Sequence, residues 1–235
     1  MDKKFQSIND KTWCFWINSS PPFPELIHSS WNKFEFGDPN GGFEKSMGHY
    51  SYYMIKSIDF YSQIFDFLKT NTQIELFESD ITQIGDDEIG SFIICNQEKI
   101  RGSWIFNSSK LIILEEGKYY LKQHFKGRWI RCKEPIFRKD SMVLMDFGVD
   151  QLDSPCFMYL LPTTTNSALI EFTSFSKHEF KSEIYTHQIN KYLQKKYPGV
   201  EFEMIEEEAG VIPMTDTTFS PSISNQIINI GTPAG

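Results

Sequence analysis

Two carboxylates inside apolar segments are the residues of this sequence that are best suited to chemistry. Asp146 lies within the apolar segment 143–147, and Glu171 lies within the apolar segment 168–173. A carboxylate in such a segment either faces water from an exposed sheet face or is buried for chemistry. For a single residue the exposed face has the higher base rate, because buried Asp and Glu are uncommon. Because the sequence has two such carboxylates, each followed by a phenylalanine, we give burial the same weight as an exposed sheet face.

Burial would turn either carboxyl into an acid. An apolar environment raises the pKa of a carboxyl and keeps it protonated at neutral pH. The chain also holds 21 Phe, 10 Tyr and 5 Trp, and aromatic faces stabilise cations. This combination predicts a general acid in an aromatic pocket, acting on an apolar substrate that reacts through a carbocation. The alternative is that the aromatic residues simply form the core.

Composition excludes several other classes of function. The 235 residues are 40% hydrophobic, which supports one or two domains with a sizeable core. A net charge of -8 argues against nucleic-acid binding, which needs a basic surface. No apolar run is long enough for a membrane-spanning helix, and no signal peptide is evident. The four cysteines and five histidines lack the spacing of metal ligands, so we expect no metal site and reduced thiols.

The expected secondary structure is α+β and rich in strands. Apolar residues at helical spacing predict a helix over residues 57–69, and a second helix is expected over about 177–197. Ser176 and Glu179 have the spacing of a capping box for the second helix. Short strands are expected between the helices, including 74–77, 119–125, 129–132 and 168–175. They predict a large mixed or antiparallel sheet.

The C-terminal residues have the pattern of an incomplete phosphate-binding unit. A strand at 226–230 leads into the turn 231–235, which is rich in small residues. Such a turn usually opens a helix, whose N-terminus attracts phosphate. No helix follows in this sequence, so we expect a fragment of a longer nucleotide-binding protein.

Several segments together resemble the bacterial FAD-dependent lycopene cyclases. They occur in the order of that family and extend over nearly the whole chain; each segment alone is a weak signal, whereas the ordered set is strong. The matching segments are Asn9–Trp16, Ile58–Tyr61, Phe106–Ser108, Gln123–Gly127, Leu144–Phe147, Asp150–Gln151, Phe157–Pro162, Leu169–Ser176 and Glu208–Met214.

The resemblance implies a flavoprotein of the hydroxybenzoate-hydroxylase type, with a β-sheet substrate domain inserted into a dinucleotide-binding domain. Residues 1–16, 57–108 and 224–235 would belong to a truncated FAD-binding domain, and residues 17–56 and 109–223 mainly to the substrate domain. The sequence contains no G-x-G-x-x-G motif. Asp2 falls about where the ribose-binding acidic residue would stand. Gly231, Thr232 and Gly235 would lie in the cofactor-binding turn, and we expect the chain as written to bind FAD weakly.

The implied reaction is the cyclisation of lycopene, or another linear carotenoid, without net redox change. Glu171, which matches the essential carboxylate of the family's Glu-x-Thr strand, would protonate a terminal double bond. Asp146 would be a supporting carboxylate near the cation, and Glu208 would be either site-lining or structural. Reduced FAD would stabilise the cation electrostatically. Because the substrate lies in the bilayer, we expect a cytoplasmic protein that touches the membrane surface without spanning it.

Two departures from the family pattern and two alternative functions remain open. Gly148 stands where the family usually has Arg, which removes a charge partner expected for Asp146, and Ala234-Gly235 replaces a Gly-Gly pair. A different flavoprotein of this architecture, such as a geranylgeranyl reductase or an aromatic hydroxylase, would consume NAD(P)H. The chain could also be a catalytically inactive module that binds an apolar ligand.

Overall fold

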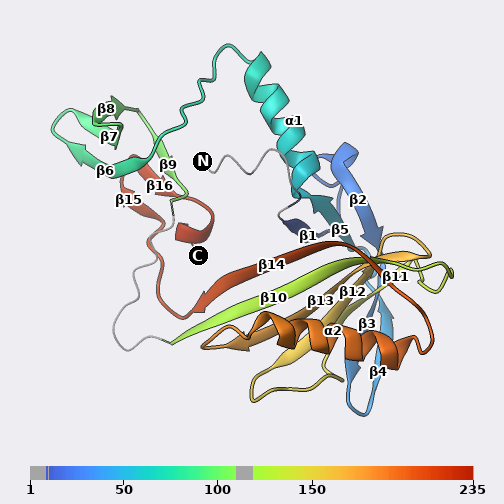
Figure 1. Cartoon of the computed structure of the whole chain (residues 1–235). Coiled ribbons are helices and arrows are strands. Elements are labelled where there is room, and N and C mark those ends of the chain that lie inside the picture. Colours follow the sequence, from blue (N-terminus) through green and yellow to red (C-terminus); the bar gives the residue numbers. More distant parts are fainter. Residues whose placement is uncertain (1–8, 10, 110–118, 235) are drawn as a thin grey trace. The chain divides into compact units, whose positions relative to one another are not determined.

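The computed structural model describes residues 9, 11–109 and 119–234 (Figure 1). The described chain forms two compact units. Unit 1 falls within Phe67–Tyr120 and Thr215–Gly235, and unit 2 falls within Lys4–Asp66 and Leu121–Met214. The chain therefore leaves unit 2 after its first third, builds most of unit 1, and returns to complete unit 2. Whether these units correspond to the predicted cofactor and substrate domains stays a prediction.

A large mixed sheet organises unit 2, as the sequence predicts. Its strands lie in the order β14-β10-β13-β12-β11-β3-β4. The pairs β10–β13, β13–β12, β12–β11 and β3–β4 are antiparallel, and β11 pairs with β3 in parallel. The strands expected separately at 119–125 and 129–132 form one continuous strand. The strands are β3 (Lys33–Asp38), β4 (Gly41–Ser46), β10 (Tyr120–Arg131), β11 (Ser141–Asp146), β12 (Cys156–Pro162), β13 (Ser167–Ser176) and β14 (Glu203–Thr215).

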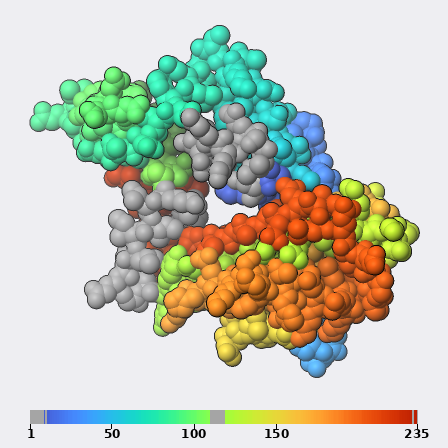
Figure 2. Space-filling model, viewed as in Figure 1, coloured from blue at the N-terminus to red at the C-terminus, as the bar shows by residue number. Residues whose placement is uncertain are grey.

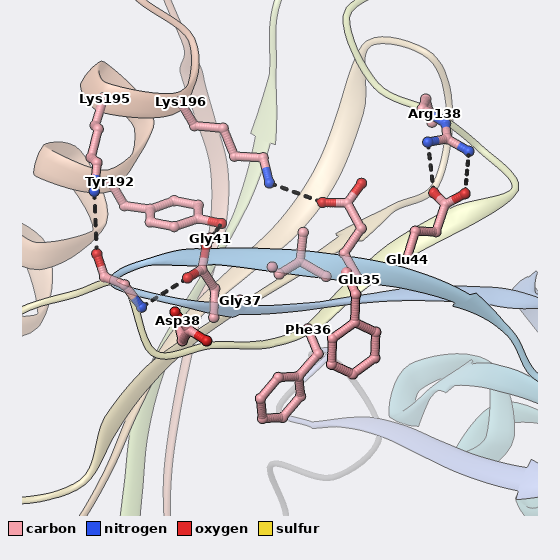
Figure 3. A pocket seen from close by; sticks show the side chains of 15 residues that line it. Glu35, Phe36, Gly37, Asp38, Gly41, Glu44, Arg138, Tyr192, Lys195 and Lys196 are labelled. Carbon is pink, nitrogen blue, oxygen red and sulfur yellow. Dashed lines mark hydrogen bonds and ion pairs between the residues drawn. The ribbon is translucent and has the colours of Figure 1, made fainter.

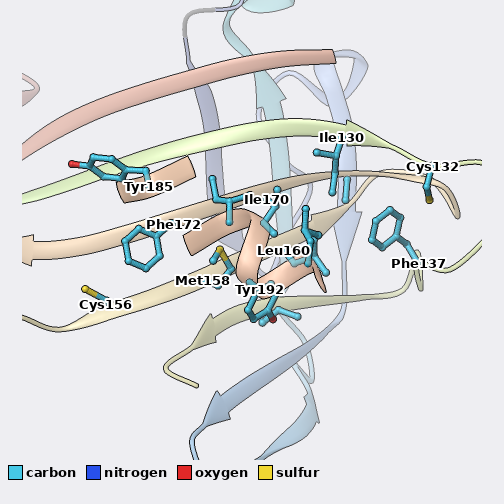
Figure 4. Close-up of a cluster of buried hydrophobic side chains, with 14 residues drawn as sticks. Ile130, Cys132, Phe137, Cys156, Met158, Leu160, Ile170, Phe172, Tyr185 and Tyr192 are labelled. Carbon is cyan, nitrogen blue, oxygen red and sulfur yellow. The ribbon is translucent and has the colours of Figure 1, made fainter. Parts of the chain in front are cut away.

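Helix α2 (Ser182–Lys196) covers one face of this sheet, and its side chains form part of the surface seen in Figure 2. The core beneath it joins strand residues such as Ile170 and Phe172 to Tyr185 and Tyr192 of the helix (Figure 4). The helix begins later than predicted. Ser176 still belongs to β13, where its hydroxyl donates to the His178 carbonyl, so the expected capping box with Glu179 does not form.

A smaller sheet covers the opposite face of the large sheet. It is ordered β1-β5-β2, and Met54 and Trp31 pack against Trp129, Leu161 and Leu169 of the large sheet. Helix α1 (Ser57–Thr70) follows β5 directly, which confirms the helix predicted over 57–69. The elements are β1 (Thr12–Ile17), β2 (Ile27–Trp31) and β5 (Ser51–Lys56), with a short 3-10 helix at Pro24–Leu26.

Unit 1 is built from short strands. The hairpins β6-β7-β8 form one sheet, and β15-β16-β9 form another in which β16 and β9 run parallel. Residues 74–77, expected as a strand, are irregular because no neighbouring strand pairs with them among the described residues. The elements are β6 (Ile81–Asp87), β7 (Gly90–Cys95), β8 (Glu98–Arg101), β9 (Ile105–Asn107), β15 (Ser222–Ser224), β16 (Ile227–Asn229) and a 3-10 helix at Thr232–Ala234.

Candidate active site

The alternation of β13 places Glu171 on the face of the large sheet that lies away from α2. Side chains along a strand point to opposite faces in turn. Ile170 and Phe172 are fully buried in the core beneath α2, whereas Leu169 packs into the cluster under the smaller sheet. Glu171 therefore shares the face of Leu169 and Thr173. This face, covered by β1 and β5, is the candidate site.

The carboxyl of Glu171 is largely cut off from water. Its cross-strand neighbours are Gly127 on β10 and Tyr159 on β12. The Thr173 hydroxyl donates to Oε1 at 2.7 Å, which leaves Oε2 to carry a proton. The side chain keeps some accessible surface, yet the carboxyl lies deep among protein atoms. Desolvation, opposed by the Thr173 hydrogen bond and aided by the charge of Glu208, raises the pKa of Glu171 to about 8.

A second carboxyl lies beside it. Glu208, on edge strand β14, is only 7% exposed, and its side chain lies across Gly127. A Cβ at residue 127 would be 3.1 Å from Glu208 Cγ. Because Gly127 pairs with Glu171, the missing side chain allows the two carboxyls to approach each other. The sequence signal for this was available: a glycine inside a strand often marks a close approach of neighbouring groups.

Several groups stabilise the charged form of Glu208. The Thr12 hydroxyl of β1 donates to Oε2 at 2.6 Å. Desolvation raises the pKa of Glu208, and the Thr12 hydrogen bond, Trp129 and Lys56 oppose this rise. Trp129 Nε1 is buried and finds no partner of good hydrogen-bond geometry among the described residues, although it lies near enough to Glu208 to lower its pKa. Lys56 Nζ lies 3.9 Å from the centroid of the Trp129 ring.

The remaining ionisable groups around Glu171 are held neutral. Desolvation raises the pKa of Cys14 on β1 and of Tyr159 on β12, each to about 12. Desolvation also raises the pKa of Tyr52 on β5. The charge of Glu171 contributes to each of these shifts, so these side chains surround the same small volume. The site is therefore dry, aromatic and able to hold one carboxyl protonated at neutral pH.

Asp146 does not join this pair, contrary to the sequence-based expectation. A register irregularity in β11 between Val143 and Asp146 turns the Asp146 side chain toward α2. There Oδ2 accepts a hydrogen bond from the Tyr192 hydroxyl at 2.9 Å, and Oδ1 accepts one from the Gly148 N–H at 2.8 Å. Asp146 thus joins α2 to the end of β11, and its expected role beside the reacting cation stays a prediction.

Asp146 lines a groove of about 580 Å³ between the β3–β4 hairpin and the end of α2 (Figure 3). The charged side chains that border it are engaged with one another. Lys196 binds Glu35 at 3.3 Å, and Arg138 forms an ion pair with Glu44 at 2.6 Å. Tyr192 also borders this groove, and burial raises its pKa so strongly that it keeps its proton. We therefore place the proton-donating chemistry at Glu171 instead.

The structure describes only part of the predicted cofactor-binding set. Asp2 and Gly235 lie outside the described residues. Gly231 follows β16 with a φ of 62°, a left-handed conformation that favours glycine. The parallel pair β9–β16 runs into this turn and the short helix that starts at Thr232. These features fit one edge of a dinucleotide site, where ligands bind beyond the carboxyl ends of parallel strands.

Comparisons with known proteins give a family by sequence and a fold by structure. The family model described as lycopene cyclase protein matches residues 3–235. No curated protein matches the chain by sequence.

Solved structures share the fold at low identity. A geranylgeranyl bacteriochlorophyll reductase-like protein from Thermoplasma acidophilum is 12% identical, with a TM-score of 0.61 over 91% of this chain and 57% of that one. A flavin-dependent halogenase from Xanthomonas campestris is 8% identical, with a TM-score of 0.56 over 89% and 52% of the chains. CtdE, solved with FAD and a substrate, is 11% identical, with a TM-score of 0.55 over 90% and 54%. The chain thus spans about half the length of these proteins and has the fold of that part.

Proposed function

The chain belongs to the lycopene cyclase family, and on this premise we propose that it cyclises the linear ends of lycopene to β-ionone rings by acid catalysis without net redox change. One observation carries the proposal. Glu171 is a carboxyl whose dry surroundings raise its pKa to about 8, so it is protonated at neutral pH. An alkene is a weak base, and its protonation needs such an acid held against it in an apolar site.

In the proposed reaction, Glu171 gives its proton to the terminal double bond of the substrate. The tertiary cation that results is attacked by the neighbouring double bond, which closes the ring. Loss of a proton then restores neutrality. The aromatic side chains of Tyr52, Tyr159 and Trp129 lie near enough to the carboxyl pair to influence or sense its charge, and aromatic rings stabilise cations. The closed, apolar surroundings keep water from capturing the cation.

FAD is the cofactor that the family implies. Gly231 and Thr232, at the end of the parallel strand pair of unit 1, would contact the cofactor. Bound in its reduced form, the flavin would supply negative charge that stabilises a cationic transition state. In this proposal Glu171 performs the proton transfer, and the flavin takes no electrons from the substrate.

We also propose that the protein meets its substrate at the membrane surface on the cytoplasmic side. Among the described residues, no helix is both long enough and apolar enough to cross a bilayer. Linear carotenoids are dissolved in the bilayer, so the site must receive them from its surface. Peripheral contact is sufficient for this and is what we expect.

The test uses the protein encoded by the complete gene, assayed with lycopene in liposomes, FAD and a reductant. Glu171→Gln keeps the shape of the side chain and its bond with Thr173, but it cannot donate a comparable proton. We expect a loss of ~10⁴-fold or more, the upper end of the range for a general acid. Retention of more than about a tenth of the wild-type rate would show that Glu171 is not the acid, because general-acid contributions are larger.

The structural similarity to a geranylgeranyl reductase-like protein is a reason to test one other function. A geranylgeranyl reductase or hydroxylase would oxidise NAD(P)H in proportion to product. Cyclic carotenoid formed without stoichiometric NAD(P)H consumption supports the cyclase proposal, whereas stoichiometric consumption with a reduced or oxygenated product would replace it. Carotenoid that binds but is recovered unchanged would identify an apolar-ligand-binding module.

A further inference from the structure

The two carboxyls of the site are held in different environments. Glu171 receives one hydroxyl hydrogen bond, from Thr173, and apart from Glu208 its ionisable neighbours are Cys14, Tyr52 and Tyr159, which burial keeps neutral. Glu208 receives the Thr12 hydroxyl and is also stabilised as an anion by Trp129 and Lys56. Burial raises the pKa of both carboxyls, but a hydrogen bond, Trp129 and Lys56 oppose that rise at Glu208, whereas only the Thr173 hydrogen bond opposes it at Glu171. Surroundings that separate the pKa values of two neighbouring carboxyls suit one to be the acid and the other to be the base.

The approach of the two groups is built into the sheet. Glu208 crosses Gly127, and Gly127 stands directly opposite Glu171 in the β10–β13 register. Glu208 Oε1 would be 3.6 Å from a Cβ at residue 127, while Oε2 is bound to Thr12. Oε1 is therefore the carboxylate oxygen that the Thr12 hydrogen bond leaves available.

We propose that Glu208 is the base of the reaction, that it accepts the proton lost on ring closure, and that Thr12 is its positioning residue. This inference rests on the proposed cyclase function. It deepens that function, because the base determines which proton leaves and hence the position of the ring double bond.

The steps balance without any further reagent. The proton on Glu171 forms a new C–H bond with the electron pair of the terminal double bond. The electron pair of the neighbouring double bond forms the ring C–C bond and leaves a cation on the methyl-bearing ring carbon. The C–H bond of the adjacent ring carbon then breaks, its electron pair becomes the ring double bond, and Glu208 takes the proton. Transfer of that proton to Glu171 restores both groups.

Product composition is a readout that a merely structural role would not change. The cation can lose a proton from the ring carbon that bears the polyene, from the ring methylene or from the methyl group. A base fixed on one side of the ring selects among these protons. Without it, the cation loses whichever proton reaches water or another group first. The ratio of β-rings to rings with other double-bond positions therefore reports on Glu208.

The experiment compares four variants of the complete protein with the wild type in the liposome assay. For Glu208→Gln we expect a rate loss of ~10²-fold or more together with a raised share of other ring isomers. Thr12→Val, which removes the donor, should shift the isomer ratio in the same direction with a smaller rate loss. Thr12→Ser keeps the hydroxyl and should resemble the wild type. Glu203→Gln, an exposed carboxylate of the same strand, is the matched control.

Two results of this comparison of variants would overturn the inference. One is Glu208→Gln with an unchanged isomer ratio and a rate within about threefold of the wild type, since removal of a base costs far more. The other is an identical effect of Thr12→Val and Thr12→Ser. A wild type that forms no cyclic carotenoid would instead refute the proposed function.

Infrared titration of the carboxyl band provides a measurement that needs no turnover. Removal of the negative charge of Glu208 should lower the pKa of Glu171, because that charge helps to raise it. An unmoved Glu171 titration in Glu208→Gln would show that the two carboxyls are uncoupled, and this too would overturn the inference.

Discussion

The side chain of Glu208 occupies the space that a side chain at Gly127 would fill. A Cβ at residue 127 would lie 3.1 Å from Glu208 Cγ and 3.2 Å from Leu169 Cδ1. The glycine therefore lets the Glu208 carboxylate, which comes from the edge strand β14, lie over β10 at Gly127. Gly127 is the residue that pairs with Glu171 of β13. One small residue in the middle of a long strand creates the carboxyl pair on which the proposed chemistry depends.

Gly127→Ala should consequently weaken both the fold and the reaction. The added methyl group must push Glu208 or Leu169 aside, and overpacking of this kind costs about 1–3 kcal/mol of unfolding free energy. Displaced Glu208 would lose its place beside Glu171, so cyclisation should fall and the isomer ratio should shift. Gly85→Ala is the control, because a Cβ there meets Phe92 at an ordinary 3.5 Å. Equal stability and activity of the two variants would contradict the packing argument.

The raised pKa of Glu171 also predicts how stability depends on pH. The unfolded chain loses this proton near pH 4.5, whereas the folded chain keeps it until about pH 8. Between these values the folded state binds more protons, so the contribution of Glu171 to stability falls as pH rises, by about 1.4 kcal/mol per pH unit at most. Above pH 8 the loss is complete.

Glu171→Gln removes this titration. The unfolding free energy of the variant minus that of the wild type, both measured by urea denaturation, should increase as the pH is raised from 5 to 8. The two curves should run parallel above that range. Parallel curves over the whole range would mean that the Glu171 carboxyl is solvated in the folded protein.

The sequence alone identifies Glu171 as the candidate acid and misses the residues around it. Glu171 could be found because an ionisable residue interrupts a strongly apolar strand, and the resemblance to the family points to the same position. Thr12, Trp129 and Gly127 could not be assigned to the site, because their meeting depends on the cross-strand register and on the smaller sheet packed over the large one. Those contacts are long-range and leave no local pattern.

For Asp146, by contrast, the local sequence pattern predicts the wrong face of the sheet. Its apolar strand resembles that of Glu171, and strict alternation would place it on the face of Leu144. The irregularity after Val143 breaks the alternation, so the side chain points toward α2. Similarly, Ser176 and Glu179 have the spacing of a helix cap, yet β13 extends through Ser176 because its partner Lys122 continues the ladder. Sheet pairing overrides the local signal in both places.

In unit 1, Asn107 should govern the stability of the parallel pair β9–β16. It is 6% exposed, its side-chain Nδ2 donates to Asn229 Oδ1 at 2.9 Å, and its side-chain Oδ1 accepts the N–H of Ser109 at 3.0 Å. Asn107→Leu leaves these partners unsatisfied, which costs about 1–3 kcal/mol each when they are buried. Amide hydrogen exchange should become faster at β9 and β16 and stay unchanged in β13. Unaltered exchange at β16 would show that the amide pair contributes nothing to unit 1.

Finally, Asp146 and Tyr192 should be coupled in stability and not in catalysis. The Tyr192 hydroxyl donates to Asp146 Oδ2 at 2.9 Å and joins α2 to the end of β11. A hydrogen bond to a charged group contributes about 1.5–3 kcal/mol. Asp146→Asn and Tyr192→Phe should each lower the unfolding free energy, and the double variant should lose less than the sum of the two.

The same three variants distinguish this structural role from the catalytic one that the sequence suggests. Because Asp146 lies on the α2 face and Glu171 on the other, each variant should keep the β-ring content of the product and the pH dependence of cyclisation. The rate, measured below the unfolding temperature, should fall by no more than a few-fold, since no proton-transfer group is lost. If Asp146→Asn abolished cyclisation while its unfolding free energy stayed at the wild-type value, Asp146 would have to act on the substrate from a conformation other than this one.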